Sequence, residues 1–543
     1  LSSVPALSPS PSAPGRRVLS QTGPANSPKN WQGVPLPGHS EPAELIGVTV
    51  AWFLGAFSSR VEEAFPAEER DSCTTADVIK RCVIPDTGED RCCYADLPWA
   101  ETRRPDFLVS HAHRRPFREL RHCLERRFAG ESSSAAVWLD FLALNHHSDA
   151  PGTADATRAA LRTAAGSAMA TLVVLDAEAV CLTRARCLWE IHAAASADPA
   201  DAAGKLEILP HALDIGSASE VGEAVSSVDV RKAAARDPAE RKAILADVDR
   251  SVGAHRFDER VRRALAHAVE RATRGAPGES AEGAALLAVA GSALRASGQL
   301  QRAQPLLQSS LSAACAAHGE ESPAAASARR SLALLHEARG LPREAGPLLE
   351  AALGAFSRLL GPADPRAAAC MGDLARVASR LGDSARAEAL YREALQSRRA
   401  AGGDSHPETA LALRSLGLFY SGRSAPPHPE AYVTELLEEA ARVARRAAGE
   451  GSPMHSAALC DLAGHLRARG RLREARGLLE EAARAQRDAL GADHLDTLTT
   501  QRDLAGLLAE AGEFERAEDL FLSVLSSLDS VTGEGSAAAA QAR

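Results

Sequence analysis

The sequence lacks the short motifs that identify several large enzyme classes. It contains no G-x-x-x-x-G-K-[ST] phosphate loop, no G-x-G-x-x-G dinucleotide fingerprint, no H-E-x-x-H metal motif and no G-x-S-x-G nucleophile elbow. Each of these motifs places a reactive or phosphate-binding group at a fixed point of its fold. We therefore expect neither ATP-driven assembly nor one of the common hydrolase architectures.

Aromatic residues and long apolar runs are also scarce. Aromatics make up 4% of the 543 residues, the formal net charge is -9, and no basic block is interleaved with aromatics, so nucleic acid is not an expected partner. The most apolar run, LIGVTVAWFLGAF at 45–57, is shorter than the roughly 20 residues of a membrane-spanning helix and predicts a packed helix or strand. We expect no membrane contact and a cytoplasmic location. Because the sequence begins at Leu1 rather than at a methionine, a targeting segment upstream is left open.

The 10 cysteines include no C-x-x-C pair, the spacing with which two thiolates reach one zinc ion from a single turn. Only Cys73, Cys82, Cys92 and Cys93 are crowded, with long gaps and one adjacent pair. A zinc site there is the less favoured interpretation, and no metal is expected. The other cysteines are scattered among apolar residues, which is typical of a reducing compartment.

The ends of the chain differ in composition from the rest. Residues 1–43 are rich in proline, serine and glycine and have almost no periodic apolar pattern, which predicts a disordered tail. Residues 44–104 are predicted to be an extension that packs on the domain after it. Residues 537–543 are predicted to be a second disordered tail.

Short apolar runs alternate with helical segments between residues 105 and 275, which predicts a parallel sheet with right-handed crossovers. Strands are expected at FLVS (107–110), VWLDFLAL (137–144) and TLVVLD (171–176), with weaker candidates at KLEIL (205–209) and VSSVDV (225–230). Helices are expected at 115–128, 157–168, 183–197, 238–252 and 256–273. This region is therefore predicted to be one α/β domain.

The C-terminal half repeats. Its main step is 42 residues, as from Gly319 to Gly361, and one longer step of 46 residues runs from Gly403 to Gly449. A second glycine series marks a turn inside each unit, and an alanine series follows it by five residues. Six units of helix, turn and helix are predicted from 281 to 536. A single hairpin cannot bury its apolar face alone, so the units are expected to stack into an all-α solenoid.

These repeats resemble tetratricopeptide repeats of the kinesin-light-chain type. The segments GGDSHPETALALRSLGLFY (402–420) and GADHLDTLTTQRDLAGLLAEAGEFERAEDLF (491–521) have the G-x-x-H-P-x-T start and the L-A…G…A-E pattern of that family. The resemblance implies a superhelix whose concave face holds partner peptides. A cargo adaptor for a microtubule motor is a further alternative, which the absence of sustained heptads before the repeats disfavours.

The region before the repeats resembles a TIR domain, which has a flavodoxin-like α/β fold. Three segments carry the likeness: FLVSHAHRRPFRELRHCLERRF, VWLDFLALNHH and TRARCLWEIHAAA. Together with CTTADVIKRCVIPDTGEDRCCYADL, they look like a TIR-like module of algal and protist proteins that often precedes such repeats. The predicted fold class is thus a flavodoxin-like, TIR-like parallel-sheet domain at 105–275, followed by a solenoid of tetratricopeptide repeats.

The TIR resemblance implies one catalytic candidate, Glu190. In plant and bacterial TIR domains that cleave NAD, the glutamate of W-C-L-x-E is catalytic, and Glu190 occupies that position here. Its carboxylate would stabilise the positive charge that develops as nicotinamide leaves. Ser110, His111 and Asp140 follow predicted strands and are candidate substrate-binding residues, because ligands gather beyond the carboxyl ends of parallel strands.

Most of these residues also have a plainer interpretation; Asp140, for example, would cap or pair within the fold. Glu190 lies off the apolar stripe of its helix, where it would face solvent or pair with Arg186 one turn earlier. His111 and His113 are expected to be exposed loop histidines, although a metal or base role with His146 and His147 is an alternative.

Two functions from different classes follow. The favoured one is a signalling scaffold, in which the repeats bind a partner and the TIR-like domain associates with its own kind. It requires no cofactor. The alternative is an NAD glycohydrolase, with NAD as its substrate, regulated by the repeats.

Overall fold

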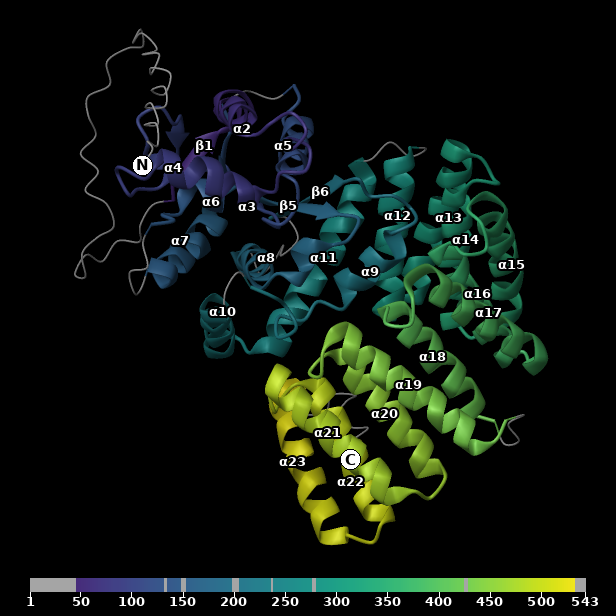
Figure 1. Cartoon of the computed structure of the whole chain (residues 1–543). Coiled ribbons are helices and arrows are strands. Elements are labelled where there is room, and N and C mark those ends of the chain that lie inside the picture. Colours follow the sequence, from purple (N-terminus) through teal and green to yellow (C-terminus); the bar gives the residue numbers. More distant parts are fainter. Residues whose placement is uncertain are drawn as a thin grey trace, which may run out of the picture. The chain divides into compact units, whose positions relative to one another are not determined.

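A mixed sheet and a row of helical hairpins follow one another along the chain (Figure 1). The computed structural model describes residues 45–130, 134–147, 153–197, 205–235, 238–275, 280–423 and 428–532. The predicted disordered tails, 1–43 and 537–543, lie outside the described residues. Within the described ranges, no helix is both long and apolar enough to cross a bilayer.

The sheet has six strands in the order β2-β1-β4-β3-β5-β6 among the described residues. Four of them pair in parallel: β3 (Phe107–Ser110), β4 (Ala136–Trp138), β5 (Ala170–Asp176) and β6 (Leu206–His211). This confirms the predicted parallel arrangement and the strands FLVS, TLVVLD and KLEIL. The extension adds two antiparallel strands at one edge, β1 (Gly47–Thr49) and β2 (Thr102–Arg103). The whole sheet is therefore mixed.

Two predicted strands are wrong or too long. VSSVDV is not a strand: Val225 lies in helix α9 (Ala218–Ser226), and Val225 and Val228 are both buried against helices at helical spacing. VWLDFLAL ends as a strand at Trp138 and turns into helix α6 (Asp140–Ala143). Phe141 and Leu142 are adjacent and both fully buried, which a one-turn helix allows and a strand with alternating faces allows only between two layers.

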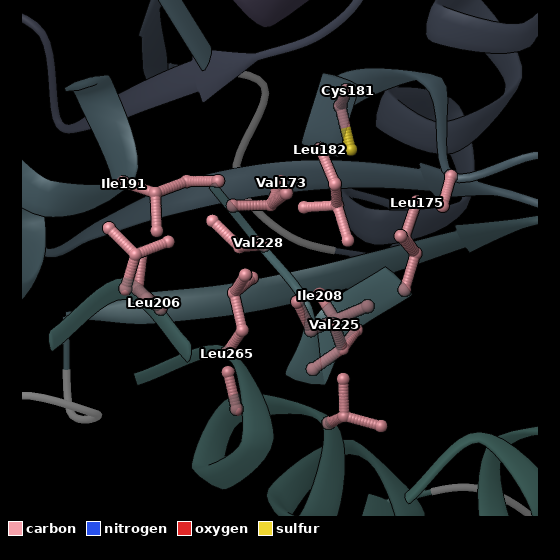
Figure 2. Packing of buried hydrophobic residues seen from close by; sticks show 14 of the residues in the cluster. Val173, Leu175, Cys181, Leu182, Ile191, Leu206, Ile208, Val225, Val228 and Leu265 are labelled. Carbon is pink, nitrogen blue, oxygen red and sulfur yellow. The ribbon is translucent and has the colours of Figure 1, made fainter. Parts of the chain in front are cut away.

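The sheet is covered on both faces because successive residues of its central strand point to opposite sides. On β5, Val173 and Leu175 face one core and Leu172 and Val174 face the other. Figure 2 shows the first core, where side chains of β5 and β6 meet those of the flanking helices. That side is covered by α7 (Thr153–Ser167), α8 (Ala185–Ala197), α9, α10 (Pro238–Ser251) and α11 (Ala254–Gly275), with η4 (Val180–Thr183) leading into α8.

The extension and α5 (Phe117–Arg127) cover the opposite face. The extension is a chain of short turns rich in aromatic contacts, such as Phe57 with Tyr94 at 5.2 Å between ring centroids. Its helical elements are α1 (Val50–Trp52), η1 (Phe53–Phe57), α2 (Ser58–Ala64), α3 (Thr75–Val78), η2 (Ile79–Val83), α4 (Ile84–Asp86) and η3 (Tyr94–Asp96). Residues 45–57 therefore form both a strand and a helix.

The described repeat region consists of twelve helices arranged as six hairpins, as the spacing predicts. The first helices are α12 (Ala281–Ala296), α14 (Pro323–Ala338), α16 (Pro365–Arg380), α18 (Pro407–Ser421), α20 (Pro453–Ala468) and α22 (Leu495–Glu510). The second helices are α13 (Leu300–His318), α15 (Pro342–Leu359), α17 (Ser384–Gly402), α19 (Glu430–Ala448), α21 (Leu472–Leu490) and α23 (Phe514–Thr532).

The repeated residues mark the hairpin boundaries for physical reasons. Gly361 has a φ of 92°, a left-handed conformation that other residues rarely adopt. Pro365 begins the next helix, where the missing N–H costs no helical hydrogen bond. Asp364 caps the same helix by accepting a hydrogen bond from the backbone of Arg366 at 2.9 Å.

The first hairpin and the sheet share one hydrophobic core. The cluster that includes Val173 and Ile208 of the sheet continues to Ala288 of α12 and Ala328 of α14. Helix α9 lies so close to α12 that a Cβ added at Gly222 would stand 2.6 Å from the carbonyl oxygen of Val289.

A second contact joins the sheet region to the start of the sixth hairpin. The ring of His494 lies 2.7 Å from a carboxylate oxygen of Asp229, and Lys232 contacts Asp496 at 2.7 Å. The side chain of Arg231 donates to the carbonyl oxygen of Leu490 at 3.3 Å. The α/β region therefore contacts both the first and the last hairpins.

Candidate functional site

The four residues singled out from the sequence come together beyond the carboxyl ends of β3 and β4. Ser110 is the last residue of β3, His111 follows it, Asp140 begins α6 after β4, and Glu190 lies on α8. Their exposed fractions are 1% for Ser110, 8% for His111, 5% for Asp140 and 8% for Glu190. The carboxyl ends of parallel strands meet at one edge of a sheet, which explains the convergence.

Arg186 lies at the centre of this cluster. Its Nε lies 3.2 Å from Asp140 Oδ2 and 3.3 Å from Glu190 Oε1. Its terminal nitrogen donates to Glu240 Oε1 on α10 at 3.2 Å. One guanidinium therefore contacts three carboxyl groups from three helices, and it compensates charges that would be costly to bury alone.

Two histidines stand on the other side of Asp140. His113 Nε2 lies 2.8 Å from Asp140 Oδ1. The ring of His111 lies 5.0 Å from the ring of His113 between centroids, and its Nε2 is buried without a hydrogen-bond partner. Burial lowers the pKa of His111 to about 3, so its imidazole is neutral at pH 7.

The two carboxyl groups of the cluster have pKa values shifted in opposite directions. Burial raises the pKa of Glu190 to about 7, and the negative charge of Asp140 adds to the rise, while Arg186 opposes it. Burial also raises the pKa of Asp140, but His113 and Arg186 outweigh it and hold that pKa below its usual range. Such a separation is typical of a pair that can act as acid and base.

Ser110 and Cys187 both lie next to Glu190. The Ser110 hydroxyl has no partner of complete hydrogen-bond geometry, but its proximity lowers the pKa of Glu190. The Cys187 thiol donates to the carbonyl oxygen of His111 at 3.4 Å, and burial raises the pKa of that thiol well above its usual value. Cys187 is therefore a neutral packing residue that fixes the turn after β3.

The expected exposure of Glu190 and His111 to solvent is wrong, whereas the expected pairing of Glu190 with Arg186 is confirmed. Glu190 does not face solvent, because α10 covers that side of α8 and contributes Glu240 to the ion-pair cluster. The predicted pairing of Glu190 with Arg186 is confirmed. His111 is buried rather than exposed, since α6 packs Phe141 against its ring at 5.7 Å between centroids.

His146 and His147 do not join the cluster. His146 lies 3.0 Å from the carbonyl oxygen of Phe141, and His147 lies 2.8 Å from the hydroxyl of Thr87. Glu240 is not among the residues expected from the sequence, because its approach to Arg186 depends on how α10 packs. The one contact at the centre of the cluster that the sequence indicates is the pair Arg186 and Glu190, because residues four apart on a helix are neighbours.

The space beside Glu190 is small. The cavity lined by Ser110, Trp138, Trp189 and Glu190 has a volume of about 10 Å³, which is roughly the room that one water molecule needs. A nicotinamide ring does not fit there unless α8 or the turn after β3 moves. Among the described residues, His111, His113 and Asp140 are the group that offers metal-binding atoms at short mutual distances.

Comparisons with known proteins identify the repeats. The Tetratricopeptide repeat family model matches residues 324–400 and 454–530. The matched segments cover nearly all of helices α14 to α17 and α20 to α23, so the chain carries tetratricopeptide repeats, which form protein-interaction scaffolds. No curated protein matches this chain. The family match does not extend to residues 105–275, so no family is shown for the α/β region.

Solved structures with similar helical repeats include three of known source. One is a structure of TPR-like repeats of a kinesin light chain from Podosopora anserina, repeats that are nearly identical to one another. It is 23% identical to this chain, covers 39% of this chain and 97% of that chain, and has a TM-score of 0.35. BtubC (BKLC) from P. vanneervenii is 21% identical over 45% of this chain and 89% of its own, with a TM-score of 0.34. The apo quorum sensor NprR from B. thuringiensis is 12% identical over 53% and 77%, with a TM-score of 0.36.

Proposed function

We propose that this chain is a scaffold whose repeats bind an extended segment of a partner protein along the row of first helices. The observation that carries the proposal is the continuity of this row. Neighbouring first helices contact one another from α12 to α20, and Arg467 of α20 pairs with Glu510 of α22 at 2.5 Å. A row of parallel helices is the kind of long surface on which repeat proteins bind peptides.

Ion pairs fix the spacing of this row. Arg330 of α14 donates to Asp373 of α16 at 2.6 Å, and Arg376 of α16 donates to Glu337 of α14 at 2.5 Å. Asp373 and Glu337 are buried, so separating either pair would leave a buried charge without its partner, which is costly. The row is thus held in one geometry before a partner arrives, which reduces the entropy lost on binding.

The middle of the row offers an apolar contact point. Leu418 lies 42 residues after Arg376, at the same place of the next hairpin, and is 39% exposed. The adjacent Phe419 is half-buried, packs on Tyr391 at 5.3 Å between ring centroids, and carries the Arg423 guanidinium 5.4 Å above its ring. An apolar side chain of a bound segment would bury Leu418 and Phe419 together.

Peptide selection tests this function. A random peptide library displayed on phage is selected against the intact chain, and the affinity of each selected peptide is measured for Leu418→Glu and for Leu522→Glu. Leu522 is the matched control, because it is 58% exposed but lies on α23, a second helix. The proposal expects a loss of at least about tenfold with Leu418→Glu alone, since a charge replaces a buried apolar contact. Equal loss in both variants, or no selected peptide, would contradict it.

We further propose that the α/β region is a TIR-like module that associates with a second copy. Its four parallel strands lie in the chain order two, one, three, four, which matches the first four strands of the five-stranded flavodoxin-type order. Sedimentation velocity of the intact chain over a wide concentration range tests the association. A monomer at every concentration would contradict it.

The second candidate function is NAD glycohydrolysis at Glu190. It is supported by the meeting of Glu190 with Ser110, His111 and Asp140 at one sheet edge. The buried position of Glu190 requires opening of the site before NAD enters. The intact chain is incubated with NAD, and nicotinamide release that disappears in Glu190→Ala would support the activity. Absence of release from a folded, self-associated sample would exclude it.

A further inference from the structure

Three metal-binding side chains converge next to the sheet edge. One atom from each of His111, His113 and Asp140 lies within 4.8 Å of the corresponding atoms of the other two. We propose that these three residues bind a divalent transition-metal ion of the zinc type. The proposal does not rest on the peptide-binding function or on NAD cleavage, although it uses His111 and Asp140, which are also candidate substrate-binding residues for NAD.

His111 supplies the first observation. The side chain is 8% exposed, and its Nε2 is buried without a hydrogen-bond partner. Buried polar atoms are nearly always paired, because an unpaired one keeps the full cost of its lost hydration. A metal ion at Nε2 would remove that cost, and neutral imidazole is a preferred ligand of zinc.

Asp140 and His113 supply the second observation. Asp140 Oδ2 is engaged by Arg186 at 3.2 Å, which leaves Oδ1 directed to His113 Nε2 at 2.8 Å. An ion held at about 2.0 to 2.2 Å from each ligand needs ligand atoms roughly 3.4 Å apart. The three ligand atoms lie within 4.8 Å of one another, so small side-chain rotations convert the present arrangement into a two-histidine, one-carboxylate site with a fourth position for water.

The turn that carries both histidines is held in place from two sides. The Cys187 thiol donates to the carbonyl oxygen of His111 at 3.4 Å. The backbone N–H of Ala76, from α3 of the extension, donates to the carbonyl oxygen of His113 at 2.9 Å. Metal ligands need supports of this kind, because a site that keeps its geometry without the ion loses less entropy when the ion binds.

The surrounding charges favour a cation. Arg186 is the nearest positive charge, but Asp140, Glu190 and Glu240 all contact it. Asp140 and Glu240 together outnumber this one guanidinium, which leaves this part of the interior able to accept additional positive charge. Arg186 then orients Asp140 as an outer hydrogen-bond partner of a metal ligand.

The test measures zinc binding by the full-length chain. Protein stripped with EDTA and dialysed is titrated with Zn²⁺ in competition with a chromophoric chelator, and with Co²⁺ for its visible spectrum. We expect one equivalent of tightly held metal and the absorption of a four-coordinate nitrogen and oxygen site. His113→Gln, His111→Ala and Asp140→Asn should each weaken Zn²⁺ binding by at least about tenfold, whereas His267→Gln, an exposed histidine on α11, should leave it unchanged.

His113→Gln is the decisive variant, because the His113 side chain is 23% exposed and its loss leaves no large cavity. Its fold is checked by circular dichroism and by its thermal unfolding midpoint. Zinc binding that survives His113→Gln and Asp140→Asn in folded protein, or a cobalt spectrum with thiolate bands, would overturn the proposal. The same holds if no equivalent of zinc is retained in competition with the chelator.

Discussion

Glu190 accepts a hydrogen bond from Arg186 at 3.3 Å, from one turn earlier on the same helix. The residue that invited a catalytic interpretation is thus part of a buried ion-pair cluster, whose guanidinium also contacts Asp140. Both descriptions hold together, because a buried carboxyl group with a raised pKa can serve chemistry as well as structure.

Removing Arg186 should destabilise the protein strongly. Arg186→Met leaves Asp140 and Glu190 buried without their shared cation, and we expect a loss of about 3 to 5 kcal/mol in the free energy of unfolding. Urea unfolding at pH 7 measures it. Arg343→Met, at an exposed position on α15, should change stability by less than about 0.5 kcal/mol. Adding Asp140→Asn and Glu190→Gln to Arg186→Met should recover much of the loss, and no recovery would argue against a charge effect.

Gly222→Ala should weaken the contact between α9 and α12. The new Cβ would meet the carbonyl oxygen of Val289 and the Cβ of Ser292 at 2.6 Å each. We expect destabilisation of about 1 to 3 kcal/mol by thermal or urea unfolding. Gly354→Ala is the matched control, because that helical glycine has nothing within 4 Å of a Cβ, and it should stabilise by about 0.5 to 1 kcal/mol. Equal effects in the two variants would disprove the close packing.

Asp258 should make stability fall as pH rises. Burial, with the nearby Asp229 carboxylate, raises the pKa of Asp258 to about 7 from 3.8. Because the folded state binds this proton more tightly than the unfolded state, the raised pKa adds to the free energy of unfolding. The contribution is complete below about pH 4 and is lost as the pH rises through 7. Asp258→Asn keeps the acceptor for the Val230 N–H but does not titrate.

The pH effect is measured as a difference between proteins. Relative to Asp258→Asn, the wild type should lose about 2 to 4 kcal/mol of unfolding free energy between pH 4 and pH 8. Asp519→Asn, at an exposed position on α23, should run parallel to the wild type. If the pH profile of Asp258→Asn also runs parallel to that of the wild type, the pKa of Asp258 is not raised.

His494 and Asp229 should be energetically coupled across the molecule. Their side chains are 11% and 8% exposed and lie 2.7 Å apart. A double-mutant cycle with His494→Ala and Asp229→Ala should give a coupling of about 0.5 to 3 kcal/mol at pH 6. A coupling within error of zero would mean that this contact is absent in solution. A cycle between His494 and Asp519, an exposed residue on α23, should show none.

The repeats could be predicted from the sequence because the determinants of a hairpin are local. Gly361 and Pro365 fix a turn and a helix start wherever they occur, so their spacing alone locates the units. The parallel strands were predictable for a similar reason, since runs such as Leu172 to Leu175 must be buried on both faces.

The environment of the site could not be predicted, because it depends on packing between segments distant in sequence. Glu240 reaches Arg186 only because α10 folds over α8, and nothing near Glu190 encodes that contact. The burial of His111 likewise depends on Phe141 from α6. The strand expected at VSSVDV is wrong because Val225 and Val228 fit a strand by residue type, whereas their three-residue spacing fits a helix.

The core shared by α9 and α12 makes the first hairpin of the repeats more resistant to local unfolding than the last. Repeat arrays fray from unprotected ends, and here the α/β region caps the first hairpin in place of a dedicated terminal repeat. At the other end, α23 presents Phe514 at 71% and Leu522 at 58% exposure. The sixth hairpin meets the sheet region through ion pairs at the start of α22, such as His494 with Asp229, whereas the first hairpin shares the apolar core of the sheet. Local unfolding should therefore begin in α23 before it reaches α12.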